Sequence, residues 1–258
     1  MGKNKLARWA ELGTFRNVIQ PEISFQSGSD HPLKGNWNNK IFGNDNPVIL
    51  ELACGKGEYT LGLSELFPES NFIGVDIKGA RMWRGARSAW EKQLGNTAFL
   101  RTRIEFINSF FGPDEVDEIW LTFPDPHPGK KNSNKRLTCP WFLNIYRNFL
   151  KDKGIINLKT DNKELFNYTL KLAVDNSLEI LMAINDVDLF LTENKPDQYS
   201  PGFLPPDPDQ MERISEGILT IKTHYEKIFL EKGLKISYLA FRLEKNRIIS
   251  HDWEKTNQ

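Results

Sequence analysis

The chain has 258 residues, of which 34 are lysine or arginine and 34 are aspartate or glutamate. A chain of this length can bury a sizeable core, as one large α/β domain or two small ones. Because the charges cancel, a general basic coat for nucleic acid is excluded, and any nucleic-acid site has to be a local patch. The two cysteines are too few for a disulfide scaffold or a metal framework. No apolar run is long enough to span a bilayer, and residues 1–15 lack the apolar region of a signal peptide. We therefore expect a reduced, cytoplasmic protein without a metal or a membrane partner.

The order of apolar runs along the chain predicts an α/β fold. Residues 1–46 are polar and partly basic, without a sustained period, and predict an N-terminal tail or an extended lead-in strand. Residues 47–258 alternate short apolar runs with stretches of helical period, which predicts βαβ units, a mostly parallel sheet and one domain. Strands are expected at 48–53, 71–77, 97–103, 116–123, 154–160, 178–184 and 234–243, and helices at 58–67, 79–94, 139–150, 162–176 and 223–233. The proline-rich stretch 192–210 is expected to be a surface loop.

The turn after the first predicted strand, in "LELACGKGEYT", carries candidate cofactor residues. Gly55 and Gly57 let a ligand approach the backbone at a turn that often needs positive φ. Asp76 ends the second strand, where an acid accepts hydrogen bonds from both hydroxyls of a ribose. Thr60 stands where a dinucleotide-binding fingerprint has its third glycine, which argues against a dinucleotide. The carboxylate of Glu51 would repel a pyrophosphate, but it would attract the sulfonium and the amino group of S-adenosylmethionine. These residues favour an S-adenosylmethionine site, and the alternative is a tight turn beside a buried, paired glutamate.

The segment "FPDPHPGKKNSNKR", residues 123–136, follows the fourth predicted strand at the ligand-binding edge of a doubly wound sheet. Pro124 and Pro126 restrict the backbone on both sides of Asp125, which predicts a carboxylate held in place for chemistry. A rigid solvated turn is the alternative, because Asp and Pro are common turn residues. The basic run that follows is expected to contact phosphate, although such runs are usually solvated. It consists of Lys130, Lys131, Lys135 and Arg136.

The chain resembles the bacterial tRNA (guanine-N7-)-methyltransferases. The resemblance rests on "LELACGKG", "NFIGVDIKGARMWRGARSA", "FPDPHPGKKNSNKRL", "INLKTDN" and "THYEKIFLEKG" in this order, with "KNKLARWAELGTFRNV" at the start, and covers most of the chain. It implies a class I methyltransferase, Rossmann-like fold, with a seven-stranded mostly parallel sheet and helices on both faces. It also implies S-adenosylmethionine as the methyl donor, and a guanine of the tRNA variable loop, expected at tRNA position 46, as the acceptor that becomes 7-methylguanosine.

The resemblance also implies roles for single residues. Glu51 and Asp76 look like the cofactor-binding acids of the family, and Asn108 falls where the family carries a short polar residue near the adenine. Asp125 matches a carboxylate assigned to both the cofactor and the active site. The residues that match substrate contacts are Asp161, Thr223, His224, Tyr225 and Glu226.

In the loop around Asp125 the chain departs from the family pattern at two positions. His127 stands where the family usually has Trp, which makes it the candidate for stacking. Gly129 stands where the family has a Lys assigned to the substrate, so Lys130 is expected to take over that contact.

Methylation of guanine N7 needs no general base, because N7 carries a lone pair and no proton. Alignment with the methyl group should dominate the rate, and a fixed carboxylate, hypothesised to be Asp125, would stabilise the positive charge that appears on the purine. The guanine N1–H and N2–H₂ donors call for a carboxylate acceptor, which Asp161 or Glu226 could supply. The alternatives are a helix N-cap for Asp161 and an exposed helix acid for Glu226, while His224 and Tyr225 could be core or surface residues.

The helix predicted at 79–94 carries basic residues at helical spacing, which suggests a face for tRNA phosphates or, alternatively, a solvated helix. These residues are Lys78, Arg81, Arg84 and Arg87. Trp83 and Trp90 are expected to pack into the core. The basic residues near the N-terminus are a further candidate to order on RNA.

Two other functions stay open at this stage. The chain could be a class I methyltransferase of a small molecule or a protein, or a catalytically silent RNA-binding relative that keeps the fold. A nicotinamide-dependent oxidoreductase is disfavoured by the missing third glycine.

Overall fold

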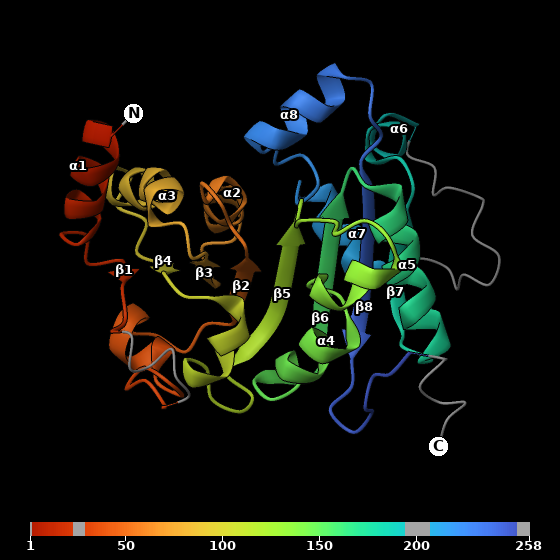
Figure 1. Cartoon of the computed structure of the whole chain (residues 1–258), viewed down its shortest axis with the longest axis horizontal. Helices are drawn as coiled ribbons and strands as arrows, with labels where there is room; N and C mark the ends of the chain where they lie inside the picture. Colours follow the sequence, from red (N-terminus) through yellow and green to blue (C-terminus); the bar gives the residue numbers. More distant parts are fainter. Residues whose placement is uncertain (1, 23–28, 194–206, 252–258) are drawn as a thin grey trace. The chain divides into compact units, whose positions relative to one another are not determined.

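The computed structural model in Figure 1 describes residues 2–22, 29–193 and 207–251. The chain divides into two compact units, which we call unit 1 (Met1–Ile119) and unit 2 (Trp120–Gln258). A domain boundary near residue 46 stays a prediction. Across the described ranges, no helix has the length and apolar character needed to cross a membrane.

Unit 1 contains four parallel strands in the order β1-β4-β3-β2. Its elements are α1 (Gly2–Leu12), β1 (Val18–Ile19), the π-helix η2 (Asn38–Phe42), β2 (Val48–Leu52), α2 (Glu58–Leu66), β3 (Asn71–Val75), α3 (Gly79–Glu91), β4 (Thr97–Leu100) and the 3₁₀ helix η3 (Ile104–Ser109). Strand β5 (Val116–Thr122) begins in this unit and ends in unit 2. The strands and helices expected between residues 48 and 103 are confirmed, with ends that differ by a few residues.

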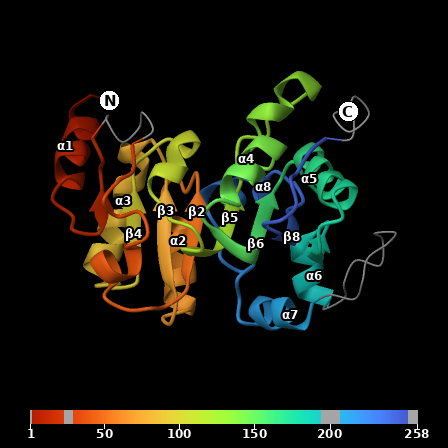
Figure 2. The same cartoon turned by 90° about the horizontal axis from the view of Figure 1, so that it is seen from below.

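Unit 2 contains β6, β8 and β7 in that order, with β8 antiparallel to both neighbours. Its elements are the 3₁₀ helix η4 (Lys130–Lys135), α4 (Pro140–Tyr146), β6 (Leu150–Thr160), α5 (Lys163–Asp175), β7 (Ile180–Ile184), α6 (Val187–Glu193), α7 (Pro208–Ser215), α8 (His224–Glu231) and β8 (Ser237–Leu243). Figure 2 shows α5 beside β8. The seven expected strands are all present, and within the described ranges the two-residue β1 is the one addition.

The described part of the predicted tail is folded into unit 1. Helix α1 lies against α3 in Figures 1 and 2, and Leu12 and Phe15 join Met82 and Phe99 in a buried cluster. The reading of this segment as an extended lead-in strand was therefore wrong for Gly2–Leu12, which form α1. Leu6 and Trp9 of this helix are exposed, whereas Leu12 is fully buried.

A second anchor holds the end of the same segment. Trp37 is fully buried, its indole N–H donates to the carbonyl of Phe110 at 2.8 Å, and its ring stacks on Phe111 with centroids 5.2 Å apart. The backbone N–H groups of Gly35 and Trp37 donate to the Glu115 carboxylate. These contacts fix the chain just before β2.

Two local predictions need correction. The loop expected at 192–210 is helical near both ends, because α6 includes residues 192 and 193 and α7 begins at Pro208. The Asp207 side chain caps α7 at the Gln210 N–H, and Pro208 occupies the first turn, where proline is favoured. The remainder of that loop, 194–206, lies outside the described residues. Trp90 is 49 % exposed, so its placement in the core was wrong, whereas Trp83 is half-buried and packs against the cluster around Leu12 and Phe15.

Candidate functional site

Glu51, in strand β2, is buried and tied to the first turn of α2. Its Oε2 accepts hydrogen bonds from the Thr60 hydroxyl and from the Thr60 backbone N–H, the latter at 2.8 Å. Gly74 is its partner across the β2–β3 ladder, and a Cβ there would lie 2.9 Å from the Thr60 hydroxyl oxygen. Glycine at this position leaves room for the contact. The buried, paired glutamate that the sequence left as an alternative is therefore present.

Asp76 connects the turn after β2 to the start of α3. One carboxylate oxygen accepts from the Gly55 N–H at 2.9 Å and the other from the Lys78 N–H at 2.7 Å. Burial raises the pKa of the Cys54 thiol, and the charges of Glu51 and Asp76 raise it further. The thiol therefore stays protonated, and the turn sits in a negative electrostatic field that suits a cation.

The two glycines of this turn have different surroundings. Both adopt positive φ, 58° at Gly55 and 70° at Gly57. A Cβ on Gly57 would lie 2.6 Å from the Phe99 ring, whereas a Cβ on Gly55 would meet nothing closer than the Ala53 carbonyl oxygen at 4.0 Å. Gly57 is thus required for packing, and only Gly55 presents open backbone to a ligand.

Asn108 lies in η3 with its side-chain oxygen buried. Within the described part of the chain this Oδ1 has no hydrogen-bond partner. A buried acceptor without a donor costs free energy, about 1–3 kcal/mol, unless a bound molecule supplies one. Asn108 is therefore a candidate contact for a ligand that carries an N–H group.

Asp125 is exposed in the loop between β5 and η4. The backbone N–H of Phe123 donates to the Lys159 carbonyl at 2.8 Å, so the loop starts from a fixed point beside β6. Phe123, His127 and Gly129 have positive φ values of 49°, 42° and 82°. The prolines flanking Asp125 are thus part of a sharply turning loop.

Arg136 holds this loop from inside. It is 2 % exposed, and its guanidinium donates to the carbonyls of Pro126 at 3.0 Å and His127 at 3.2 Å. The same group pairs with Glu164 of α5 at 2.5 Å and lies 4.4 Å from the Tyr168 ring centroid. The expectation that Arg136 contacts tRNA phosphate was therefore wrong, because its hydrogen-bond donors face the protein's own loop.

The lysines of the same basic run are arranged differently. Lys130, Lys131 and Lys135 are all exposed on η4, and Lys135 donates to the side chain of Asn132 at 3.2 Å. This short helix follows Gly129, whose N–H donates to Glu164 at 3.1 Å. The lysines stay available for an anionic partner.

Asp161 follows β6 and is half-buried. Burial raises its pKa above that of an ordinary aspartate, and its own backbone N–H counters the shift in part. The alternative role as N-cap of α5 belongs instead to Asn162, whose side chain accepts from the Leu165 N–H at 2.8 Å. A half-buried carboxylate without a capping role is what a substrate acceptor requires.

The substrate segment at the start of α8 divides into a buried and an exposed part. Thr223 caps the helix at the Glu226 N–H, and Glu226 is buried in an ion pair with the fully buried Lys159 at 2.9 Å. His224 and Tyr225 are exposed. The alternative of an exposed helix acid was therefore wrong for Glu226.

Lys159 is the residue of this region that sequence reasoning missed. Its ammonium also donates to the carbonyls of Leu219 at 3.1 Å and Ile221 at 3.0 Å. Burial lowers the pKa of Lys159 and raises that of Glu226, while their mutual attraction acts against both shifts. The available signal was a lysine within the apolar run "IINLKT", where an inward-facing cation needs a partner.

On α3 the predicted basic face is only partly free. Arg87 pairs with Glu91 at 2.7 Å, while Arg81 and Arg84 are exposed. Among the described residues, no three or more His, Cys, Asp and Glu side chains lie together so that they could hold a metal ion.

Comparison with known proteins identifies strong similarities. A family model described as "Putative methyltransferase" matches residues 45–192. The chain is 43 % identical to a tRNA (guanine-N(7)-)-methyltransferase of Bacteroides thetaiotaomicron, over 96 % of this chain and 89 % of the relative. It is 31 % identical to a protein of the same name from Listeria monocytogenes, over 88 % of this chain and 92 % of the relative.

Solved structures with little sequence identity share the fold. An antibiotic-related methyltransferase matches with a TM-score of 0.53 at 13 % identity, over 84 % of this chain and 96 % of its own. The 16S rRNA methyltransferase KamB matches with a TM-score of 0.50 at 12 % identity, over 83 % of this chain and 95 % of its own. The predicted fold class, a Rossmann-like α/β methyltransferase fold with a mostly parallel sheet, is confirmed.

Proposed function

The chain belongs to the tRNA (guanine-N(7)-)-methyltransferase family, and on this premise we propose that it methylates N7 of a guanine in the tRNA variable loop. The observation that carries the proposal is 43 % identity to a relative of this name over 96 % of the chain. S-adenosylmethionine is the methyl donor of such enzymes, and when bound it supplies an electrophilic methyl group on a sulfonium. Since the substrate is tRNA, we also propose that the protein works in the cytoplasm.

The residues of unit 1 fit this cofactor. Glu51 and Asp76 give the turn after β2 a negative potential, which attracts a sulfonium and an amino group. Gly55 leaves its backbone open to a ligand. The buried Oδ1 of Asn108 can accept a hydrogen bond from the adenine amino group. We assign cofactor binding to these residues and structural support of the turn to Gly57.

Asp125 is the residue to which we assign both cofactor binding and charge stabilisation. Guanine N7 attacks with its own lone pair, so no side chain has to remove a proton. A fixed carboxylate favours the positive charge that the purine gains as the methyl arrives. The Arg136 bonds to the two carbonyls that follow Asp125 restrict the backbone there, which supports a positioned rather than a mobile acid.

Asp161 is our candidate for the acceptor that reads the guanine N1–H and N2–H₂ donors. Glu226 is the weaker candidate, because its carboxylate is already engaged by Lys159 and is 1 % exposed. We propose that the Lys159–Glu226 pair instead fixes the start of α8. Thr223, His224 and Tyr225 lie at that helix start and are the further substrate contacts that we propose.

The loop lysines are proposed to contact the tRNA backbone. Lys130, Lys131 and Lys135 are exposed on one short helix that directly follows the loop of Asp125. Phosphate contacts of this kind position a nucleic acid and make its binding dependent on salt.

The test is to incubate the protein with methyl-labelled S-adenosylmethionine and a tRNA transcript that lacks modified bases. We expect label in 7-methylguanosine after digestion of the RNA, and at one guanine of the variable loop after mapping. The control is the same transcript with that guanine replaced by adenine, which should take up no label.

Three outcomes would contradict the proposal. Label in a protein or a small molecule, but not in RNA, would indicate a methyltransferase of another substrate. Binding of tRNA without methyl transfer would indicate a catalytically silent relative. Label in the control transcript at the same level would place the reaction at another base.

A further inference from the structure

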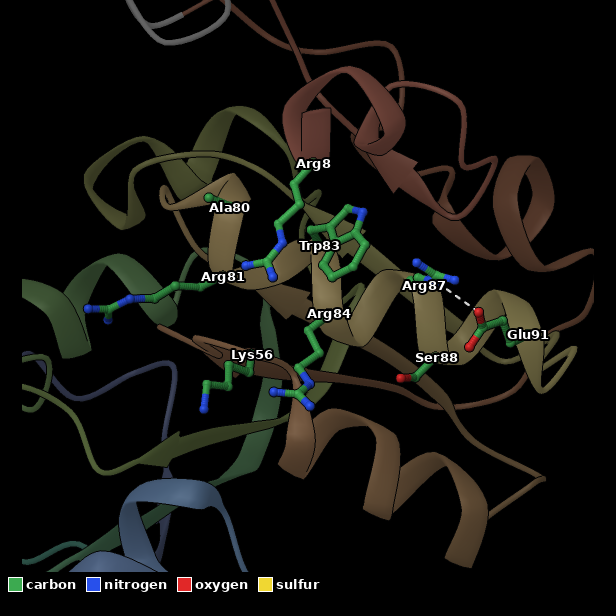
Figure 3. A pocket seen from close by; sticks show the side chains of 9 residues that line it. All are labelled: Arg8, Lys56, Ala80, Arg81, Trp83, Arg84, Arg87, Ser88 and Glu91. Atoms are coloured by element: carbon green, nitrogen blue, oxygen red, sulfur yellow. Dashed lines mark hydrogen bonds and ion pairs between the residues drawn. The ribbon is translucent and has the colours of Figure 1, made fainter. Parts of the chain in front are cut away.

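Unit 1 contains a basic pocket of about 500 Å³ that shares none of the predicted cofactor residues. It is formed by α1, by the turn before α2 and by the exposed side of α3, as Figure 3 shows. The side chains that matter here are Arg8, Lys56, Arg81, Trp83, Arg84 and Arg87. The pocket therefore joins three segments that are far apart in the sequence.

The charge of this pocket is strongly unbalanced. Five of its lining residues are cations, and its single carboxylate, Glu91, is paired with Arg87 at 2.7 Å. Within the described ranges, no ion pair involves the other four cations. Because the whole chain has a net charge of zero, this is a local concentration of uncompensated positive charge.

Trp83 gives the pocket a fixed aromatic surface. Its indole N–H donates to the Glu11 carboxylate at 2.9 Å, which holds the ring in place. The Arg8 guanidinium lies 4.7 Å from the ring centroid, and Figure 3 shows it reaching from α1 beside the indole. An arginine that packs its planar face on an aromatic ring keeps its N–H donors, which lie in the guanidinium plane, for a phosphate.

Lys56 is brought to the same pocket by close backbone packing. A Cβ on Gly85 would lie 2.5 Å from the Lys56 carbonyl oxygen and 3.1 Å from the Gly57 Cα, so the turn rests directly on α3. Lys56 is thus held near Arg84, the residue that precedes Gly85, and Figure 3 shows both at the lower side of the pocket. Lys56 lies between the two turn glycines, so the pocket adjoins the turn that we assign to the cofactor.

We propose that this pocket binds backbone phosphates of the tRNA. The inference rests on the proposed function, because tRNA is the polyanion that such a methyltransferase must hold. Arginine forks recognise phosphate in a bidentate manner, and four uncompensated cations around one cavity offer several donors to a phosphate backbone. Arg8 makes α1 part of the RNA-binding surface in its folded form.

The experiment compares the double variant Arg81→Ala/Arg84→Ala with the control Lys92→Ala/Arg103→Ala. The control removes two exposed cations of unit 1 that lie outside the pocket and pair with Glu65 and Glu105. Affinity for an unmodified tRNA transcript is measured by fluorescence anisotropy between about 50 and 200 mM salt. We expect the pocket variant to bind tRNA roughly tenfold or more weakly, with a log–log salt slope reduced by about 1.5. The control should keep the wild-type slope.

Two further measurements separate binding from folding. Cofactor affinity and the melting temperature should stay at the wild-type values in the pocket variant, because both arginines are exposed. Arg8→Ala changes a different helix and should lower the salt slope by about 1. If the double variant does not fold, this variant still decides the question.

The outcomes distinguish this proposal from the proposed function. Wild-type protein that binds tRNA with the expected salt slope but transfers no methyl group would contradict the function and leave the pocket assignment standing. Wild-type protein that methylates tRNA, with pocket variants that keep wild-type affinity and slope, would overturn the pocket assignment alone. Lost binding to anionic vesicles with unchanged binding to tRNA would assign the pocket to a lipid surface and also overturn it.

Discussion

Replacing Arg136 with alanine tests whether the loop of Asp125 is held by this buried side chain. The change removes the donors to the Pro126 and His127 carbonyls and the packing on Tyr168. The carbonyls belong to half-buried residues that water can reach, so each loss costs about 1 kcal/mol, at the low end of the range. The stacking and the buried arginine stem add a further 1–2 kcal/mol. The ion pair adds little, because the Glu164 side chain is 52 % exposed.

We therefore expect Arg136→Ala to lower the free energy of unfolding by about 3 kcal/mol, or by less where the loop detaches locally. The released Asp125 loses its fixed position, and kcat for methyl transfer should fall by about 10- to 100-fold. Urea denaturation and single-turnover methylation measure the two effects. A loss of stability with kcat within about twofold of wild type would refute the positioning role.

Glu164→Gln is the matched control for that experiment, because it keeps the bonds from Arg136 to both carbonyls. Hydrogen bonds from Arg136 and from the Gly129 N–H lower the pKa of Glu164. A lowered pKa in the folded state means that the unfolded chain binds more protons than the folded chain. The contribution of Glu164 to the free energy of unfolding is therefore complete above the ordinary pKa of a glutamate, and it is lost as the pH falls through the lowered pKa. Wild type should show this acid-side loss and the glutamine variant should not.

Four further substitutions follow from the site. Asp125→Ala should abolish methyl transfer and shift stability by less than about 0.5 kcal/mol, because the side chain is exposed; near wild-type activity would contradict its assignment. Gly57→Ala should destabilise the protein by about 2–4 kcal/mol, because its backbone has positive φ and the added methyl would meet the Phe99 ring. Gly55→Ala should cost about 1 kcal/mol and weaken cofactor binding. Equal melting temperatures of the two variants would contradict this difference. Asp161→Asn should stabilise the protein at neutral pH. The pKa of the Asp161 carboxyl is raised in the folded state, so the wild type loses stability as the pH rises from the ordinary pKa of an aspartate. Equal pH profiles of the two proteins in thermal melts would contradict this prediction.

The strands of unit 1 and the turn after β2 were predictable because local rules agree there. Buried strands read as apolar runs, and the positive φ values of Gly55 and Gly57 match the glycines that mark the turn. The roles of Arg136 and Lys159 were not predictable from the same rules. A cation in a basic run is usually solvated, and only the folded chain shows that loop carbonyls surround Arg136 and that Glu226 meets Lys159.

The departures of the loop from the family pattern have a physical explanation in its backbone. Gly129 has φ 82° and ψ 151°, a conformation that is essentially restricted to glycine, so a lysine at this position would strain the loop. The next residue, Lys130, begins η4 and is exposed, which places a cation one residue after the position where the resemblance leads us to expect one. His127 has φ 42°, in the left-handed region where histidine is enriched and a bulky residue is disfavoured. Gly129→Lys should therefore lower stability without improving methyl transfer, and an unchanged midpoint in urea denaturation would contradict this.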